Sequence, residues 1–146
     1  MPVKIIIAIL LFTPFIAMSQ TLPEWTFYLN KTKLFTSSVD TITNVSLSTK
    51  DTGLVTFDFK NRDTNFKRSV IIMNEKRNTL LQKRVENNCT KVSFLLENLH
   101  DKTSLQPVTI CISDIPSDPA KAALVRVAPV AICRIVWTDN VPNLRK

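Results

Sequence analysis

Apolar and polar residues alternate along several short segments of the chain. In residues 54–60, Val55, Phe57 and Phe59 fall on one side and the polar residues between them fall on the other. A period of two places successive side chains on opposite faces of a strand. The segment therefore predicts a strand with one face in a core and the other in water.

Further segments rich in β-branched and aromatic residues predict more strands. Residues 69–73 and 80–85 flank a short polar stretch and predict a hairpin. Residues 123–138 are long enough for two strands, or for one strand bent at Pro129, because proline cannot donate to a central ladder. The remaining predicted strands are 25–29, 42–47 and 108–113. Seven or eight strands of this spacing predict an all-β fold, a β-sandwich that is immunoglobulin-like in broad form.

One segment, residues 93–100, has a helical pattern. Ser93 is a favoured N-cap residue, and Leu95, Leu96 and Leu99 would share one side of a short helix. We therefore expect one short helix in the sandwich. Trp25 and Trp137 are expected in its core, although exposed rings could instead stack on a sugar or a peptide.

The first nineteen residues have the three parts of a secretory signal peptide. Lys4 precedes the apolar run 5–12, and Ala17-Met18-Ser19 supplies a small-residue cleavage site. Pro14 interrupts the run before it reaches the length of about 20 residues that a membrane span needs. We expect cleavage after Ser19, a secreted or periplasmic location and no membrane span. The predicted organisation is residues 1–19 as signal peptide, 20–139 as sandwich domain and 140–146 as basic tail.

The composition excludes several functions. The formal net charge is +7, but the basic residues are scattered, and an exported protein rarely meets nucleic acid. We therefore expect no nucleic-acid partner, and favour a protein or an envelope glycan. Gly53 is the one glycine of the chain, so the glycine-rich motifs that hold nucleotide cofactors are absent. No cofactor is expected.

Three cysteines, Cys89, Cys111 and Cys133, follow the signal segment. Export permits a disulfide among them, but the odd number leaves at least one thiol outside any bond within the chain. The sequence does not choose the pair. Their spacing matches no zinc motif, and no metal site is expected.

The densest group of polar side chains lies in residues 113–123. Asp114, Ser117 and Asp118 are candidates for binding a cation or a polar ligand. The structural alternative is that Asp118 caps a helical turn begun by Pro119, a favoured first helical residue. We favour the cap. The one histidine, His100, stands beside Asp101, where a catalytic role would need a nucleophile brought near by the fold.

Two stretches resemble a known group of proteins. They are Trp25-Thr26-Phe27-Tyr28-Leu29-Asn30-Lys31 and the segment 116–127, which reads Pro-Ser-Asp-Pro-Ala-Lys-Ala-Ala-Leu-Val-Arg-Val. Both are similar to segments of small exported bacterial proteins of unassigned function. The resemblance implies a bacterial envelope location and no particular activity. Ala128-Pro129 stands where a more basic, uninterrupted strand would be expected, so the resemblance gives that edge no role.

These observations favour a secreted or periplasmic, non-enzymatic module that binds a macromolecular partner or an envelope component. Two alternatives stay open. One is a structural subunit that assembles by adding strands at a sheet edge. The other is a small hydrolase or carrier with a site near His100, Asp114 or Asp118.

Overall fold

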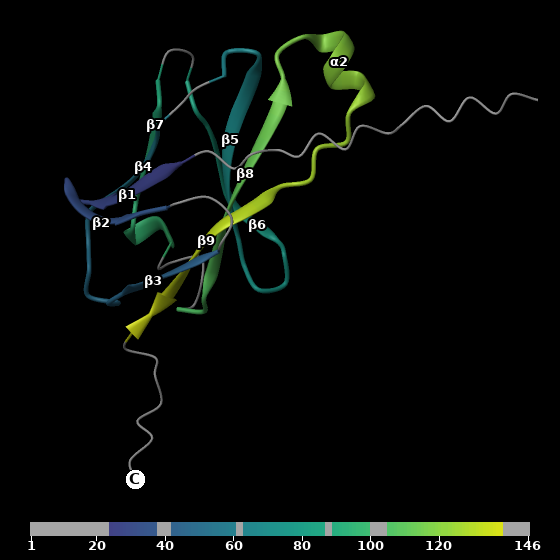
Figure 1. The fold of residues 1–146 in the computed structure, drawn as a ribbon. Coiled ribbons are helices and arrows are strands. Elements are labelled where there is room, and N and C mark those ends of the chain that lie inside the picture. Colours follow the sequence, from purple (N-terminus) through teal and green to yellow (C-terminus); the bar gives the residue numbers. More distant parts are fainter. Residues whose placement is uncertain (1–23, 38–41, 61–62, 87–88, 100–104, 139–146) are drawn as a thin grey trace, which may run out of the picture.

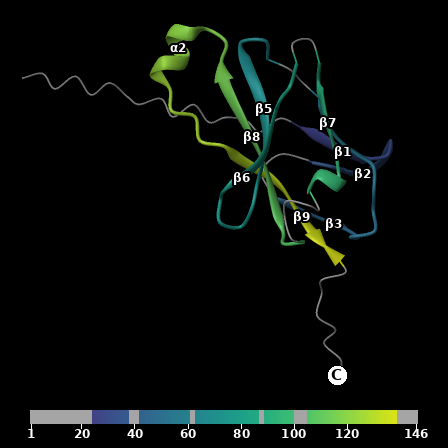
Figure 2. The same cartoon turned by 180° about the vertical axis from the view of Figure 1, so that it is seen from behind.

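The computed structural model describes residues 24–37, 42–60, 63–86, 89–99 and 105–138. Two sheets face each other and form the predicted all-β sandwich (Figures 1 and 2). The described part of the chain contains no helix long and apolar enough to span a membrane. The strands are β1 (Trp25–Leu29), β2 (Thr32–Thr36), β3 (Thr43–Leu47), β4 (Leu54–Phe59), β5 (Phe66–Met73), β6 (Thr79–Arg84), β7 (Lys91–Leu95), β8 (Val108–Pro116) and β9 (Val130–Trp137).

The four-stranded sheet has the order β2-β1-β4-β7 and is antiparallel throughout. Asn30 and Lys31 both have positive φ, as a tight turn between β1 and β2 requires. The Asn30 side chain then holds the start of β4: its Oδ1 accepts from Leu54 N at 2.9 Å, and its Nδ2 donates to Thr52 O at 2.7 Å. Gly53, with φ +113°, lies so close that a Cβ there would collide with Asn30 Oδ1.

The five-stranded sheet has the order β3-β9-β8-β5-β6. Its β5–β6 pair is the hairpin predicted from residues 69–73 and 80–85, and Asn78 N donates to Asn74 Oδ1 within the turn. All neighbours are antiparallel except β3, which runs parallel to β9. The chain passes repeatedly between the two sheets, so most strands pair with partners distant in sequence.

The core lies between the sheets and is built from the alternating strands. Phe57 is fully buried and packs edge-to-face on Phe27, with ring centroids 5.0 Å apart. Trp25 and Trp137 are buried as expected, and the indole N–H of Trp137 donates to Gln106 O at 3.0 Å. Burial of these large side chains on both inner faces stabilises the sandwich.

Three local predictions differ from the structure. Ser93 does not cap a helix. It lies within β7, where its hydroxyl forms a 2.7 Å hydrogen bond with Thr56 of β4. Residues 93–95 belong to β7 and residues 97–99 are helical, whereas His100, the last residue of the predicted helix, lies outside the described residues. Strand β2 was not predicted, and the last strand begins only after Pro129, which brings the described strands to nine.

A second helix, α2 (Pro119–Leu124), joins β8 to β9. Both views show it beyond the end of β8, away from the four-stranded sheet (Figures 1 and 2). Asp118 is its N-cap: Asp118 Oδ1 accepts from Ala120 N at 2.9 Å. Pro119 begins the helix, so the capping prediction is confirmed.

Candidate functional site

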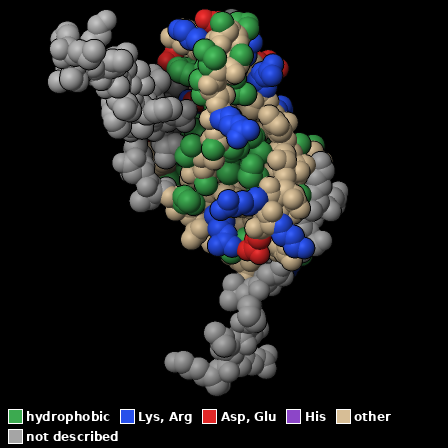
Figure 3. Space-filling view, turned by 90° about the vertical axis from the view of Figure 1, so that its right-hand side faces the viewer, with side chains coloured by type: hydrophobic (Ala, Val, Ile, Leu, Met, Phe, Trp, Pro, Cys, Tyr) green, Lys and Arg blue, Asp and Glu red, His purple; other side chains and the backbone are tan. Residues whose placement is uncertain are grey.

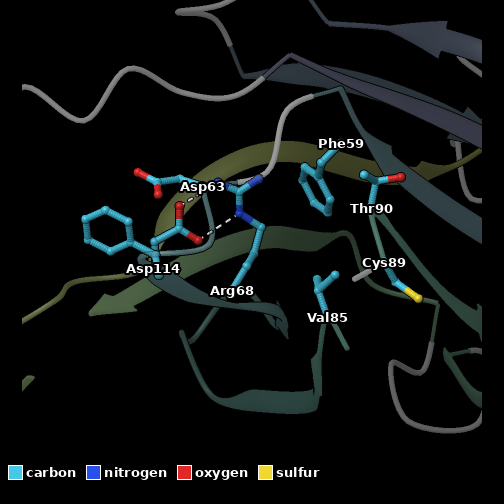
Figure 4. A pocket seen from close by; sticks show the side chains of 8 residues that line it. Phe59, Asp63, Arg68, Val85, Cys89, Thr90 and Asp114 are labelled. Carbon is cyan, nitrogen blue, oxygen red and sulfur yellow. Dashed lines mark hydrogen bonds and ion pairs between the residues drawn. The ribbon is translucent and has the colours of Figure 1, made fainter. Parts of the chain in front are cut away.

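A small pocket opens at one end of the sandwich, where β4, β6 and β8 end and β5 begins (Figure 4). Its volume is about 10 Å³, enough for roughly one water molecule. It is too small for a sugar or a peptide side chain. The lining residues are Phe59, Asp63, Phe66, Arg68, Val85, Cys89, Thr90 and Asp114.

An ion pair between neighbouring strands dominates this pocket. Arg68 of β5 stands directly opposite Asp114 of β8 and donates to both carboxylate oxygens, at 2.7 and 2.6 Å. The two side chains are only 16% and 19% exposed. The guanidinium also lies over the Phe59 ring, 4.8 Å from its centroid. The pair thus covers this end of the core, and its two opposite charges neutralise each other.

The three candidates of the acidic loop all have partners within the chain. Both oxygens of Asp114 accept from Arg68, and Asp118 caps α2. The Ser117 hydroxyl donates to Thr64 O at 3.1 Å. In the described residues, no three His, Cys, Asp or Glu side chains gather in a way that could hold a metal ion.

His100 and Asp101 lie outside the described residues, so the hydrolase alternative stays a prediction. The sequence reasoning also missed Arg68, which it counted among the scattered basic residues. The available signal was its position in the strand: Arg68 shares the inward side of β5 with Val70 and Ile72. A charge on the buried side of a strand needs a partner there.

No disulfide joins the three cysteines in the structure. Cys133 lies opposite Ile110 and faces the core, whereas Cys111, the residue after Ile110, points to the other side of the sheet. Burial raises the pKa of the Cys133 thiol to about 12 and also raises that of Cys111. Cys89 is exposed at the rim of the pocket.

The outer side of the five-stranded sheet is a second candidate. Strands β5 and β8 do not alternate: Ile71 and Cys111 point outward, lie opposite each other, and are only 7% and 5% exposed. Ala131 follows in the same row across β9. We call the outward apolar residues of this sheet the apolar face; its members are Ile71, Met73, Cys111, Ile115, Ala131 and Val136.

The two outer sides of the sandwich therefore differ. On the four-stranded sheet, the outward positions are mostly polar, as Thr56 and Asp58 of β4 illustrate. Figure 3 views the molecule from the five-stranded side and shows hydrophobic side chains gathered in the middle of the surface, with Lys and Arg above and below them. Outward basic residues of these strands are Lys67, Arg84 and Arg134, and Arg134 pairs with Glu75 at 2.6 Å.

These features are one small pocket and one apolar face. The Arg68–Asp114 pair fills the pocket with its own contacts, whereas no described strand or helix forms a third layer over the apolar face. Comparison with family models, with curated protein sequences and with solved structures gives no match for this chain.

Proposed function

We propose that the chain is an exported, non-enzymatic module whose apolar face binds a protein partner. The observation that carries this proposal is that β5 and β8 have apolar residues on both sides: Ile71, Met73, Cys111 and Ile115 point outward, away from the core. Strands that are apolar on both sides are typical of sheets covered on both faces. Here the inner side meets the other sheet, and within the described residues the outer side meets no further layer. Ile115 on this face is 41% exposed, and exposed apolar surface marks interaction sites.

The chemistry of the surface supports a particular kind of partner. Lys67 and Arg84 are exposed beside the apolar face, and no outward position of its strands carries an acidic residue in the described part of the chain. A partner with an apolar centre and acidic side chains around it is the complement of this surface. The apolar face has no aromatic ring, so a protein fits it better than a stacked glycan.

Photo-crosslinking in the exporting cells tests the proposal. A photoreactive residue replaces Met73 on the apolar face or, as a control, Leu95, a half-exposed leucine on the other sheet. We expect a discrete adduct with a second protein from position 73 and none from position 95. Equal adducts from both positions, or none from either, would contradict the proposal.

The partner identified in this way is then purified and titrated with variants. Ile115, 41% exposed on the apolar face, is changed to Glu; Leu95→Glu is the matched control. A buried negative charge facing acidic groups should weaken binding at least about tenfold for Ile115→Glu, with no change for Leu95→Glu. Equal effects would mean that this face is not the binding surface.

Export itself is part of the proposal and rests on residues 1–19. If the segment is a cleaved signal peptide, the intact mass of the exported protein begins at Gln20. A product that stays in the cytoplasm and retains Met1 would refute the proposed location.

Strand addition is a second candidate because one sheet edge lacks protection. Edge β6 carries Lys83 and Arg84, and Lys83 also donates to Ser93 O of edge β7 at 2.7 Å. Edge β3 reads Thr-Asn-Val-Ser-Leu, without charge or proline. Uncharged edges accept further strands. Concentration-dependent assembly in sedimentation velocity, abolished by Ser46→Lys, would support this candidate; a monomer at all concentrations would exclude self-assembly.

A further inference from the structure

The connection between β8 and β9 exposes apolar residues with almost no contact to the sandwich. Helix α2 has no buried residue. Leu124, its last residue, is 86% exposed, more than any other large apolar side chain described, and Val125 after it is 50% exposed. Ala120 and Ala123 are exposed as well. The segment 119–129 is therefore an apolar projection that the fold does not use for its core.

The charges of this projection have one sign. Lys121 and Arg126 are both exposed on either side of Leu124 and Val125, and the segment 119–129 contains no acidic residue. Asp118, just before it, is occupied as the helix cap. The cations form no ion pair within the described residues. An apolar apex flanked only by cations is the pattern of surfaces that enter the interface of an anionic bilayer.

We propose that the segment 119–129 binds anionic lipid surfaces. Leu124 and Val125 enter the boundary between headgroups and acyl chains, and Lys121 and Arg126 lie at the level of the phosphates. Helix α2 extends beyond the end of β8 (Figures 1 and 2), and apolar side chains on such a projection suit a deformable bilayer. This inference goes beyond the protein-binding proposal because it rests on different residues.

Vesicle sedimentation tests it with the exported protein. We expect binding to mixed phosphatidylcholine–phosphatidylglycerol vesicles, little binding to phosphatidylcholine alone, and weakening by salt. Leu124→Gln should lower the partition coefficient about tenfold or more. Leu95→Gln, which changes a half-exposed leucine on the opposite sheet, should leave it unchanged. No binding to anionic vesicles would overturn the inference and would leave a protein groove as the partner of this segment.

The basic residues have their own test. Neutralising Lys121 and Arg126 together should lower binding to anionic vesicles by more than tenfold, since each cation near such a surface contributes roughly a fivefold factor. Lys33→Gln, on the exposed strand β2, is the control. If Lys33→Gln weakens binding as much as neutralising Lys121 or Arg126 alone, the electrostatic attraction comes from the whole protein and the segment 119–129 is not the contact with the membrane.

Insertion is separated from simple adsorption by a fluorescent reporter. Both native tryptophans, Trp25 and Trp137, are buried, so a Leu124→Trp variant adds one exposed indole. Its emission should shift to the blue on anionic vesicles and stay unchanged with phosphatidylcholine alone. Because Leu124 is 86% exposed, the variant should retain the wild-type melting temperature. Sedimentation without a spectral shift would show adsorption without insertion and would refute the proposed contact.

Discussion

Removing one partner of the Arg68–Asp114 pair should destabilise the sandwich strongly. In Arg68→Met, the Asp114 carboxylate loses both of its short hydrogen bonds while it remains only 19% exposed. An uncompensated buried charge costs about 3–5 kcal/mol. Residual contact with water reduces this cost, so we expect a loss of about 2–4 kcal/mol in the free energy of unfolding.

Urea unfolding followed by tryptophan fluorescence measures this loss. With a slope of about 2 kcal/mol/M, the middle of the range for a small domain, the midpoint should fall by roughly 1–2 M. The double variant Arg68→Met/Asp114→Leu removes both charges and should recover to within about 1 kcal/mol of the wild type. Two apolar side chains can fill the site between Phe59 and the strand pair.

The exposed pair Arg134–Glu75 is the matched control. Its bond length of 2.6 Å is the same as that of the buried pair, but its side chains are 43% and 50% exposed. Arg134→Met should therefore cost less than about 1 kcal/mol. If Arg68→Met costs no more than Arg134→Met, the buried pair does not hold this end of the core and the reasoning is wrong.

Three further predictions concern single residues. Gly53→Ala should lower the free energy of unfolding by about 2–4 kcal/mol, because alanine at φ +113° is strained and its Cβ meets Asn30 Oδ1; a melting temperature equal to wild type would contradict this. Iodoacetamide at pH 8 should label Cys89 in the native protein, whereas Cys133, whose buried thiol has a pKa of about 12, should react only after unfolding; rapid native labelling of Cys133 would refute its burial. Asp118→Ala should cost about 0.5–1 kcal/mol and Asp118→Asn almost nothing, and calcium should leave the wild-type melting temperature unchanged; a calcium-dependent rise would favour the cation site.

The sequence was most informative where a segment has one buried face. Val55, Phe57 and Phe59 are all buried, as their alternation predicts. The secondary structure of short apolar runs was harder to predict, because Leu95 and Leu96 fit a helix as well as a strand. Residues 91–95 form a strand because they pair with β4, in which Leu54 lies opposite Leu95. No local pattern contains that information.

The candidate site was only partly predictable for the same reason. Asp118 was recognised as a cap because a cap is a local motif. Asp114 was singled out without its partner, since Arg68 lies 46 positions earlier and meets it only through the β5–β8 register. The apolar face was not predicted: residues 70–73 and 110–112 are short apolar runs, but only the strand order shows that β5 and β8 are neighbours and that their outward residues form one surface.

The parallel pairing of β3 with β9 has a consequence for the order of folding. Thr43 pairs with Cys133 and Leu47 with Trp137, so β3 has its strand partner almost at the end of the chain. Among the described strands β3 has no other neighbour. During synthesis it therefore stays unpaired until residues 130–137 have emerged. Contacts of such sequence separation slow folding. This topology therefore keeps the five-stranded sheet incomplete until the last strand is available.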